Sequence, residues 1–292
     1  MFHSCLICTD FTDGLHRLVN CVSSLSSSGL KQIVFFHSVP LWEAGAIPRI
    51  DTEEIERSRQ RLSVALSGVP QGVEVRVEVS SGQPEDTIPR ELRAHPVDVI
   101  VMGTPVRALL QERLFGSTSA AIAKATNKPL LILRPQLIST YTMAELNLRC
   151  QMLWRYLLVP YNDSPTARYL LTQLVHYAHN RPENSCDRCL LLWVVEDGIR
   201  NELIIQQRLQ TARERLAEVA EELRKLGLIV ETEVRQGDLL PTSLAIAVEY
   251  DITAIAIASD SRTNPLEWTV ASSALELLHH SWFPLLWFSD KH

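Results

Sequence analysis

Residues 98–118, DVIVMGTPVRALLQERLFGST, decide the fold that this chain is expected to adopt. Residues 99–102 form a short apolar run typical of a buried strand, and Gly103 lets the chain turn directly after it. Gly116-Ser117-Thr118 then opens an alanine-rich helix. A helix start carries unpaired backbone N–H groups and a partial positive charge, which suit an anion. This strand–loop–helix unit therefore predicts a phosphate-binding turn on an α/β scaffold.

The length and composition of the chain exclude several classes of protein. A length of 292 residues fits two domains of about 100–150 residues each. A net charge of −6, without a dense run of Lys and Arg, excludes a typical nucleic-acid-binding surface. No apolar run approaches the ~18–20 residues that span a bilayer, and no basic segment precedes an apolar one at the N-terminus. Six cysteines without secretory features favour a reducing compartment, so we expect a cytoplasmic protein with neither nucleic acid nor membrane as partner.

Short apolar runs alternate with amphipathic stretches through the first half of the chain. The apolar runs predict strands at residues 5–9, 33–39, 99–102 and 130–133, and alternating apolar and charged residues predict an edge or half-exposed strand at residues 73–79. Helices are predicted between them, among them residues 13–25 and 52–66. Regular alternation implies a parallel sheet with helices on both faces, and such sheets bind ligands at the carboxyl ends of their strands. Asp10, Gly103 and Gly116 are expected at that edge.

The second half repeats this pattern at a nearly constant offset, which indicates an internal repeat. The equivalent positions are Asp10 and Asn162 (152 residues apart), Gly82 and Gly237 (155), Gly103 and Ser259 (156), and Pro129 and Pro284 (155). The predicted fold class is α/β, with two tandem, doubly wound, five-stranded parallel-sheet domains. We expect domains at residues 1–138 and 154–292, joined by a linker at residues 139–153.

Three stretches of the first repeat resemble the universal stress protein family, and two such units in one chain resemble its tandem members. They are LICTDFT at residues 6–12, the Gly82-x-Pro84 turn, and VIVMGTPVR…FGSTSAAIAKATNKPLLILR. The family pattern is Gly, two residues, Gly, nine residues, Gly, then Ser or Thr. Here it reads Gly103, two residues, Val106, nine residues, Gly116-Ser117, so the spacing is kept and one glycine is replaced. The resemblance implies the adenine-nucleotide α-hydrolase-like fold.

The resemblance also implies an adenine nucleotide, ATP or AMP with Mg²⁺, in the first repeat. The residues that it implicates are Thr9, Asp10, Val39, Met102, Gly103, Gly116, Ser117 and Thr118. The carboxylate of Asp10 suits ribose hydroxyls or an adenine amine, and the guanidinium fork of Arg107 suits phosphate. Val106 is the departure from the pattern, because a β-branched residue is poorly suited to a positive φ.

Two functions stay open on these residues. One is an adenine-nucleotide-binding regulatory protein of the stress response, with the ligand in the first repeat. The other is a nucleotide-free module for protein–protein interaction, with both sites degenerate. The second repeat is expected to be degenerate in either case, because Asn162 and Ser259 replace the motif residues and Asp260 disfavours phosphate. In the family the last strands pair two units, so residues 130–133 and 285–288 are expected to form an intrachain pseudo-dimer, with a homodimer and an unidentified protein partner also open.

Signatures of catalysis and of metal binding are weak. The chain has no lysine-containing phosphate loop and no Gly-x-Ser-x-Gly elbow, so we predict no catalytic residue and at most slow ATP hydrolysis. His176, His179, Cys186 and Cys189 are residue types that ligate zinc. Their order and spacing favour a surface histidine pair and buried thiols instead, so no metal site is predicted.

Overall fold

The computed structural model describes residues 1–41, 49–104, 117–197, 201–260 and 273–290. The chain divides into two compact units, residues 2–151 and residues 152–292, the latter grouped with Met1. The predictions for Val106, Arg107 and Gly116 lie outside the described residues.

The first unit is built on five parallel strands in the order β3-β2-β1-β4-β5. They are β1 (Ser4–Cys8), β2 (Gln32–Val39), β3 (Glu74–Ser81), β4 (Val99–Gly103) and β5 (Leu130–Leu133). The inner strands are buried along most of their length, because helices cover both faces. In contrast, β3 lies at one edge and alternates apolar residues with Glu74, Arg76 and Glu78. The chain reverses its direction of progress across the sheet between β1 and β4, which places a ligand-binding crevice at their carboxyl ends.

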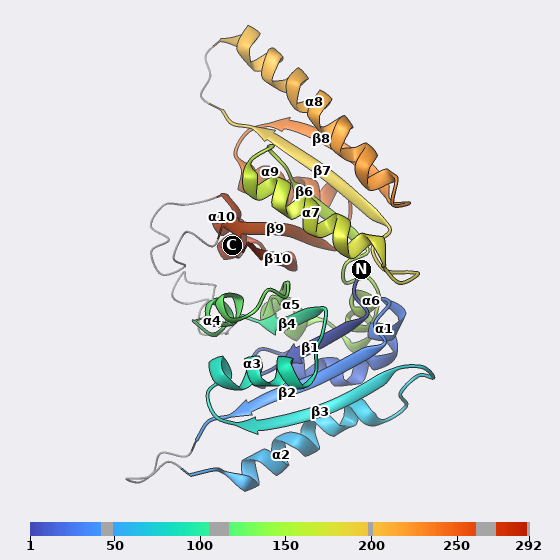
Figure 1. The fold of residues 1–292 in the computed structure, drawn as a ribbon, viewed down its shortest axis with the longest axis vertical. Helices are drawn as coiled ribbons and strands as arrows, with labels where there is room; N and C mark the ends of the chain where they lie inside the picture. Colours follow the sequence, from blue (N-terminus) through green and yellow to red (C-terminus); the bar gives the residue numbers. More distant parts are fainter. Residues whose placement is uncertain (42–48, 105–116, 198–200, 261–272, 291–292) are drawn as a thin grey trace. The chain divides into compact units, whose positions relative to one another are not determined.

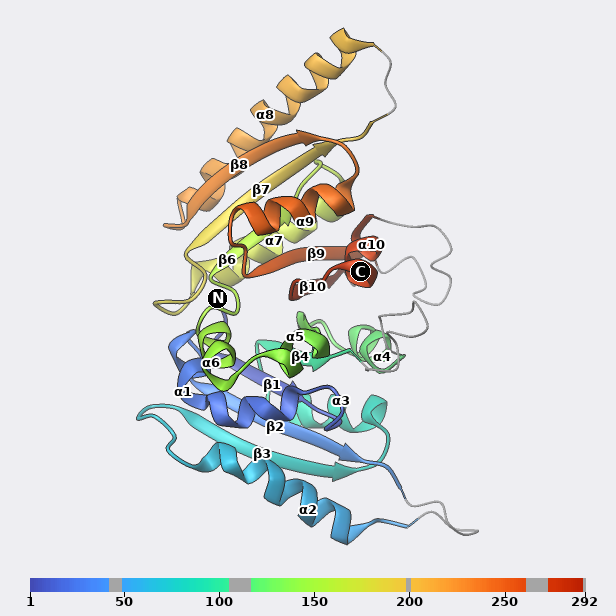
Figure 2. The ribbon, with the colours of Figure 1, turned by 180° about the vertical axis from the view of Figure 1, so that it is seen from behind.

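Helices cover both faces of this sheet. Figures 1 and 2 show α1 and α3 on opposite faces. The helical elements are η1 (Leu15–Cys21), α1 (Val22–Ser27), α2 (Thr52–Leu62), η2 (Ser63–Leu66), α3 (Pro84–Ala94), α4 (Ser117–Ala125), α5 (Pro135–Thr140) and α6 (Met143–Gln151). The single helix expected at residues 13–25 is instead a 3₁₀ segment followed by a short α-helix. Gly14, in a left-handed conformation, starts it, and its carbonyl accepts from the amide of Arg17 three residues on (3.1 Å).

The segment expected as a linker, residues 139–153, differs from that expectation. It contains α6 and belongs to the first compact unit up to Gln151. Arg17 donates to the backbone carbonyls of Ile138 and Tyr141, and Ser24 Oγ donates to Asn147 Oδ1 over 2.7 Å. Leu146 and Cys150 are buried, while most of α6 is exposed. Because only two positions of α6 are buried, the segment shows no amphipathic pattern from which the helix could be predicted.

The second unit has the same architecture, which confirms the predicted fold class. Its parallel strands run in the order β8-β7-β6-β9-β10. They are β6 (Tyr156–Pro160), β7 (Arg188–Val195), β8 (Ile229–Gln236), β9 (Ala254–Asp260) and β10 (Leu285–Asp290), and the helices are α7 (Pro165–His179), α8 (Glu202–Arg224), α9 (Leu239–Glu249) and α10 (Ser273–His280). Figures 1 and 2 show α7 and α9 on opposite faces of this sheet. Within the part of the chain that is described, no helix is long and apolar enough to cross a membrane.

The repeat extends to backbone conformation. Phe11 (φ 64°) and Asp163 (φ 59°) are both left-handed and lie 152 residues apart, each three residues after the first strand of its unit. The equivalent glycines Gly82 (φ 134°) and Gly237 (φ 140°) also have nearly the same backbone conformation. Their amides donate to the last residue of the second strand, Val39 over 2.9 Å and Val195 over 3.0 Å.

The strand register corrects one equivalence drawn from the sequence. Gly103 pairs with Leu133, and Ala258 pairs with Phe288. Because Leu133 and Phe288 are both the fourth residue of the last strand, the counterpart of Gly103 is Ala258 rather than Ser259. Ser259 accepts a hydrogen bond from the indole Nε1 of Trp287 over 2.8 Å. The second unit therefore carries a Cβ where the first has none.

Candidate functional site

The first unit has a pocket of about 210 Å³ at the carboxyl ends of β1, β2 and β4, beside the starts of α3 and α4. Its lining residues are Cys8, Thr9, Asp10, Asp13, Phe36, Ser38, Pro84, Ile88, Met102, Gly103, Thr118 and Ser119. Five residues predicted from the sequence are among them: Thr9, Asp10, Met102, Gly103 and Thr118. Val39 is buried at the end of β2 and does not line this pocket, and Ser117 begins α4.

Asp10 shapes the turn that follows β1. Its Oδ1 accepts from the amide and the hydroxyl of Thr12, each over 2.8 Å, and from the amide of Asp13 over 3.0 Å. This is the self-capping turn that Asp forms readily, and it lets Phe11 adopt its left-handed backbone. Asp10 itself is exposed at the pocket. One carboxylate thus both fixes the turn and faces the pocket.

Asp13 is a site residue that the sequence reasoning missed. It is only 4% exposed, and its Oδ1 accepts from Thr9 Oγ1 (2.8 Å) and from the amide of Leu15 (2.9 Å). Burial, together with the charge of Asp10, raises the pKa of Asp13 to about 6, although its hydrogen bonds act in the opposite direction. The only available signal was an acidic residue three positions after Asp10, which is common in turns.

The need for glycine at position 103 comes from Asp13. The φ of Gly103 is not positive, so its backbone does not need glycine to make the turn that the sequence suggested. A Cβ built there would lie 2.6 Å from Asp13 Cβ and 2.9 Å from Asp13 Oδ2, closer than real Cβ atoms approach. The end of β4 lies so close to the turn after β1 that only a residue without a side chain fits at position 103.

A side-chain hydrogen bond connects the first turn of α4 to the first turn of α3. The hydroxyl of Thr118 donates to Glu85 Oε1 over 2.9 Å. Ser38 Oγ, at the end of β2, donates to the Gly82 carbonyl (2.7 Å) and lies 2.9 Å from Thr87 Oγ1. These bonds hold the two helix starts at the crevice, where their backbone amides can serve as donors to an anion.

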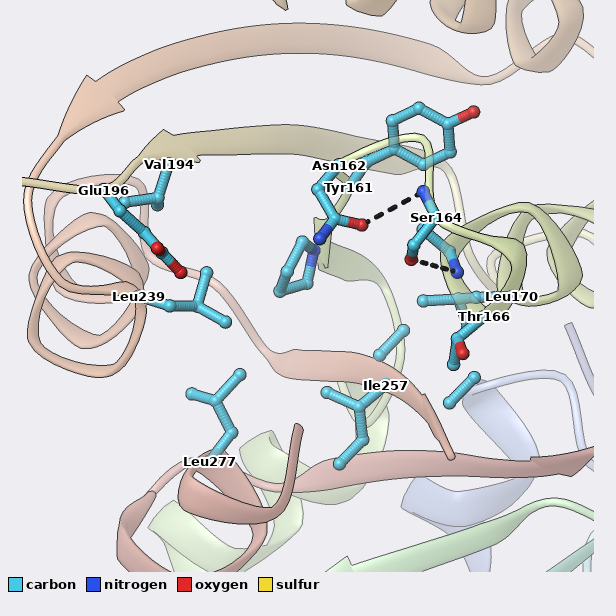
Figure 3. Close-up of a pocket in the computed structure, with 14 residues that line it drawn as sticks. Tyr161, Asn162, Ser164, Thr166, Leu170, Val194, Glu196, Leu239, Ile257 and Leu277 are labelled. Atoms are coloured by element: carbon cyan, nitrogen blue, oxygen red, sulfur yellow. Dashed lines mark hydrogen bonds between the residues drawn. The ribbon is translucent and has the colours of Figure 1, made fainter. Parts of the chain in front are cut away.

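The second unit has a pocket of about 320 Å³ at the equivalent sheet edge (Figure 3). It is lined by Pro160, Tyr161, Asn162, Ser164, Thr166, Ala167, Leu170, Val194, Glu196, Leu239, Ala256, Ile257, Ala258 and Leu277. Figure 3 shows Asn162 and Glu196 on different sides of the pocket, and Leu239, Leu277 and Ile257 along its apolar wall. The described lining holds one carboxylate, that of Glu196, and the described lining of the first pocket holds two, those of Asp10 and Asp13; neither includes a Lys or Arg.

Local hydrogen bonds occupy the polar residues of this second turn. Asn162 Oδ1 accepts from the amide of Ser164 (3.3 Å), and Ser164 Oγ caps α7 by accepting from the amide of Ala167 (3.2 Å). Asp163 accepts from Arg168 Nε (2.8 Å) and from the hydroxyl of Tyr161 (3.0 Å). The turn is therefore built like the first one, with an amide in place of the carboxylate of Asp10.

The four residues considered for zinc do not come together. His176 and His179 are exposed on α7, whereas Cys186 and Cys189 are buried, and the two thiols contact each other. Among the described residues, no three of these four form a cluster of ligand atoms. The six cysteines of the chain are all buried and none forms a disulfide.

Comparison with known proteins gives the family. The model of the universal stress protein family matches residues 1–134 and again residues 154–288. A solved universal stress protein from Archaeoglobus fulgidus aligns over 99% of both chains with a TM-score of 0.68 and 18% identity. A structure described as a putative universal stress protein from Pseudomonas aeruginosa aligns over 99% of this chain and 93% of its own, with a TM-score of 0.61 and 13% identity. No curated protein matches the chain. At these identities the structures show the fold.

Proposed function

The chain belongs to the universal stress protein family and carries two copies of the family's unit in tandem, and we propose that its first unit binds an adenine nucleotide that regulates it in the stress response. The observation that carries the proposal is the pocket at the carboxyl ends of β1 and β4. There Asp10, Gly103 and the start of α4 meet in one crevice. A carboxylate suits the ribose hydroxyls, and a helix start suits phosphate.

The dimensions of the pocket limit how the nucleotide is held. Pockets that enclose whole ligands measure roughly 300–1000 Å³, and this one measures about 210 Å³. The proposed arrangement places the nucleoside against Thr9, Asp10 and Met102, with the phosphates outside the enclosed part, near the first turn of α4. ATP or AMP, with Mg²⁺ where the phosphates require it, fits this arrangement.

The second unit is proposed not to bind a nucleotide phosphate. Its pocket has Asn162 in place of Asp10, so it lacks the carboxylate that is proposed to bind the ribose hydroxyls. Ala258, the counterpart of Gly103, adds a Cβ at the strand end. No catalytic residue is part of this proposal. Buried free thiols support a reducing compartment such as the cytosol, while pairing of the units through β5 and β10, and a homodimer, stay predictions.

The alternative is an interaction module that binds no nucleotide. Two features favour it: Val106 replaces a motif glycine, and the hydroxyl of Thr118 is already bound to Glu85. A Val106→Gly variant separates the two functions. If the first unit is a weakened nucleotide site, the glycine raises the affinity for ATP, whereas an unchanged affinity in a folded variant favours the interaction module.

The direct experiment is to denature the purified protein, identify released small molecules by mass spectrometry, and titrate it with ATP by calorimetry. Asp10→Asn retains the oxygen that accepts from Thr12 but removes the charge, so the fold is kept and the affinity is expected to fall at least tenfold. Asn162→Ala, in the matching turn of the second unit, is the control and should leave the affinity unchanged. No released nucleotide and no binding at millimolar ATP would reject the proposal.

A further inference from the structure

Two carboxylates and one imidazole meet on the side of the first sheet away from α1. Glu78 projects from the edge strand β3, Glu91 from the last turn of α3, and His95 is the residue that caps α3. His95 Nε2 lies 3.4 Å from Glu91 Oε1 and 3.9 Å from Glu78 Oε1. One ligand atom from each residue lies within 4.8 Å of the other two. The cluster is separate from the pocket at the other end of the strands.

Glu91 is the unusual member of this cluster. It is only 8% exposed, and its buried Oε1 makes no hydrogen bond; the nearest donor is His95 Nε2 at 3.4 Å, which forms an ion pair with it when the imidazole is protonated. An unsatisfied buried carboxylate oxygen is costly, so it needs an explanation. The second unit shows what the position requires structurally: its counterpart 155 residues later is Ile246, which is 2% exposed in the core of α9. Packing at this position is therefore served by an apolar side chain, and the carboxylate of Glu91 instead lies beside His95 and Glu78.

We propose that Glu78, Glu91 and His95 form a binding site for a divalent transition metal, with Zn²⁺ as the best fit. Zinc takes imidazole nitrogen and carboxylate oxygen at about 2.0–2.2 Å, and tetrahedral geometry then places ligand atoms about 3.3 Å apart. The distance of 3.4 Å between His95 and Glu91 already meets this requirement. Glu78, which is 41% exposed, has only to approach from 3.9 Å. Water completes the fourth position.

Arg76 competes with the metal. Its Nη1 donates to His95 Nδ1 over 3.2 Å, which places the proton of a neutral imidazole on Nε2, the atom that would bind the metal. Metal binding needs the other tautomer, with the proton on Nδ1, so Arg76 must then withdraw. It is able to do so, because its side chain is 43% exposed and already pairs with Glu74. Removal of Arg76 is therefore expected to strengthen metal binding.

The second unit supplies a control within the same chain. The counterparts of the three ligands are Glu233, Ile246 and Tyr250, and the hydroxyl of Tyr250 donates to Glu233 Oε1. This arrangement offers one carboxylate and a phenol, which is no zinc site. Glu233→Gln therefore changes an equivalent strand carboxylate without touching the proposed ligands.

The test is calorimetric titration of the full chain, first freed of metal by a chelator, with Zn²⁺ alone. One equivalent should bind to the unaltered chain. Glu91→Gln and Glu91→Ile should weaken binding at least tenfold, Arg76→Gln should strengthen it, and Glu233→Gln should have no effect. Glu91→Ile takes the residue of the other unit, so its metal-free melting temperature should match or exceed that of the original chain and show that folding is retained.

Cobalt distinguishes this site from binding at the histidines of α7 or at the buried thiols of Cys186 and Cys189. Co²⁺ bound to Glu78, Glu91 and His95 should give the absorption of nitrogen and oxygen ligands without a thiolate charge-transfer band. The same spectrum should persist in a His179→Ala variant. A thiolate band, loss of binding in His179→Ala, or unchanged zinc affinity in both Glu91 variants would overturn the proposal.

Discussion

The carboxylate of Asp13 lies against the face of Gly103 on which any other residue would carry its side chain. This contact joins the turn after β1 to the end of β4, the two strands between which the chain reverses its progress across the sheet. The second unit has Pro165 and Ala258 at the corresponding positions. The contact therefore belongs to the first unit alone, in which we propose the nucleotide site.

Gly103→Ala should destabilise the first unit by about 1–3 kcal/mol, the usual cost of an overpacked core. The nearest atom is Asp13 Cβ at 2.6 Å, which cannot rotate away because it sits next to the backbone. Urea denaturation measures the loss. Adding Asp13→Gly should recover part of it, since that change removes the obstructing atoms. A loss that is unaffected by the second change would contradict this explanation.

Asp13→Asn should stabilise the protein more at pH 8 than at pH 5. The folded pKa is about 6, raised from 3.8 mainly by burial. The proton binds more tightly to the folded state, so the contribution of Asp13 to stability is complete below about pH 4 and is lost as the pH rises through 6. A neutral amide avoids that loss, and the advantage should grow by about 1–2 kcal/mol between pH 5 and pH 8. Thermal unfolding at both pH values measures it, and an equal advantage at the two would refute the assignment.

At position 11 the glycine variant should be more stable than the alanine variant, which reverses the usual order of the two residues. Its backbone is left-handed, and its ring lies 3.8 Å from the guanidinium carbon of Arg61 and 4.4 Å from the ring of His37. Both Phe11→Ala and Phe11→Gly lose these contacts, but only glycine escapes the left-handed strain of about 1–2 kcal/mol. The glycine variant should therefore melt at the higher temperature. At Thr12, whose φ is not positive, alanine should be the more stable of the two.

The first unit should fold as residues 1–151 and be weakened as residues 1–138. The shorter fragment lacks α6, with its buried Leu146 and Cys150, and the Tyr141 carbonyl that accepts from Arg17 over 2.7 Å. Loss of two buried side chains should cost about 2–4 kcal/mol. Urea denaturation of the two fragments compares them directly. Equal stability would show that α6 is dispensable.

The sequence predicted the architecture because three independent signals agreed on it: the pattern of apolar residues, the spacing of the glycine motif and the internal repeat. Apolar runs located four strands of the first unit, since buried parallel strands are apolar along their length, and the alternation of apolar and charged residues located the edge strand β3. The spacing between Gly103 and Gly116-Ser117 then identified the motif, and the offset between the halves identified the repeat. The pocket residues Asp10 and Gly103 followed from their place at strand ends, and Thr9 followed from the resemblance to the family.

The remaining features depend on contacts between distant segments. Asp13 became part of the site only because β4 passes against it, and its burial leaves no trace in the local pattern. The same holds for Glu78 and His95, which come together because the C-terminal end of α3 lies beside the side chain of Glu78 on β3. The counterpart of Gly103 was misplaced by one residue, because alignment by residue type favoured Ser259, whereas strand pairing favours Ala258.

The edge strands β3 and β8 affect the tendency of the protein to aggregate at high concentration or on heating. Each ends its sheet with a row of charged side chains, Glu74, Arg76 and Glu78 in one and Glu231, Glu233 and Arg235 in the other. An open edge offers backbone donors and acceptors to any passing strand, and charges along it make such pairing unfavourable. These two rows should keep separate molecules from joining sheet to sheet into aggregates, which is valuable in a protein whose family serves cells under stress.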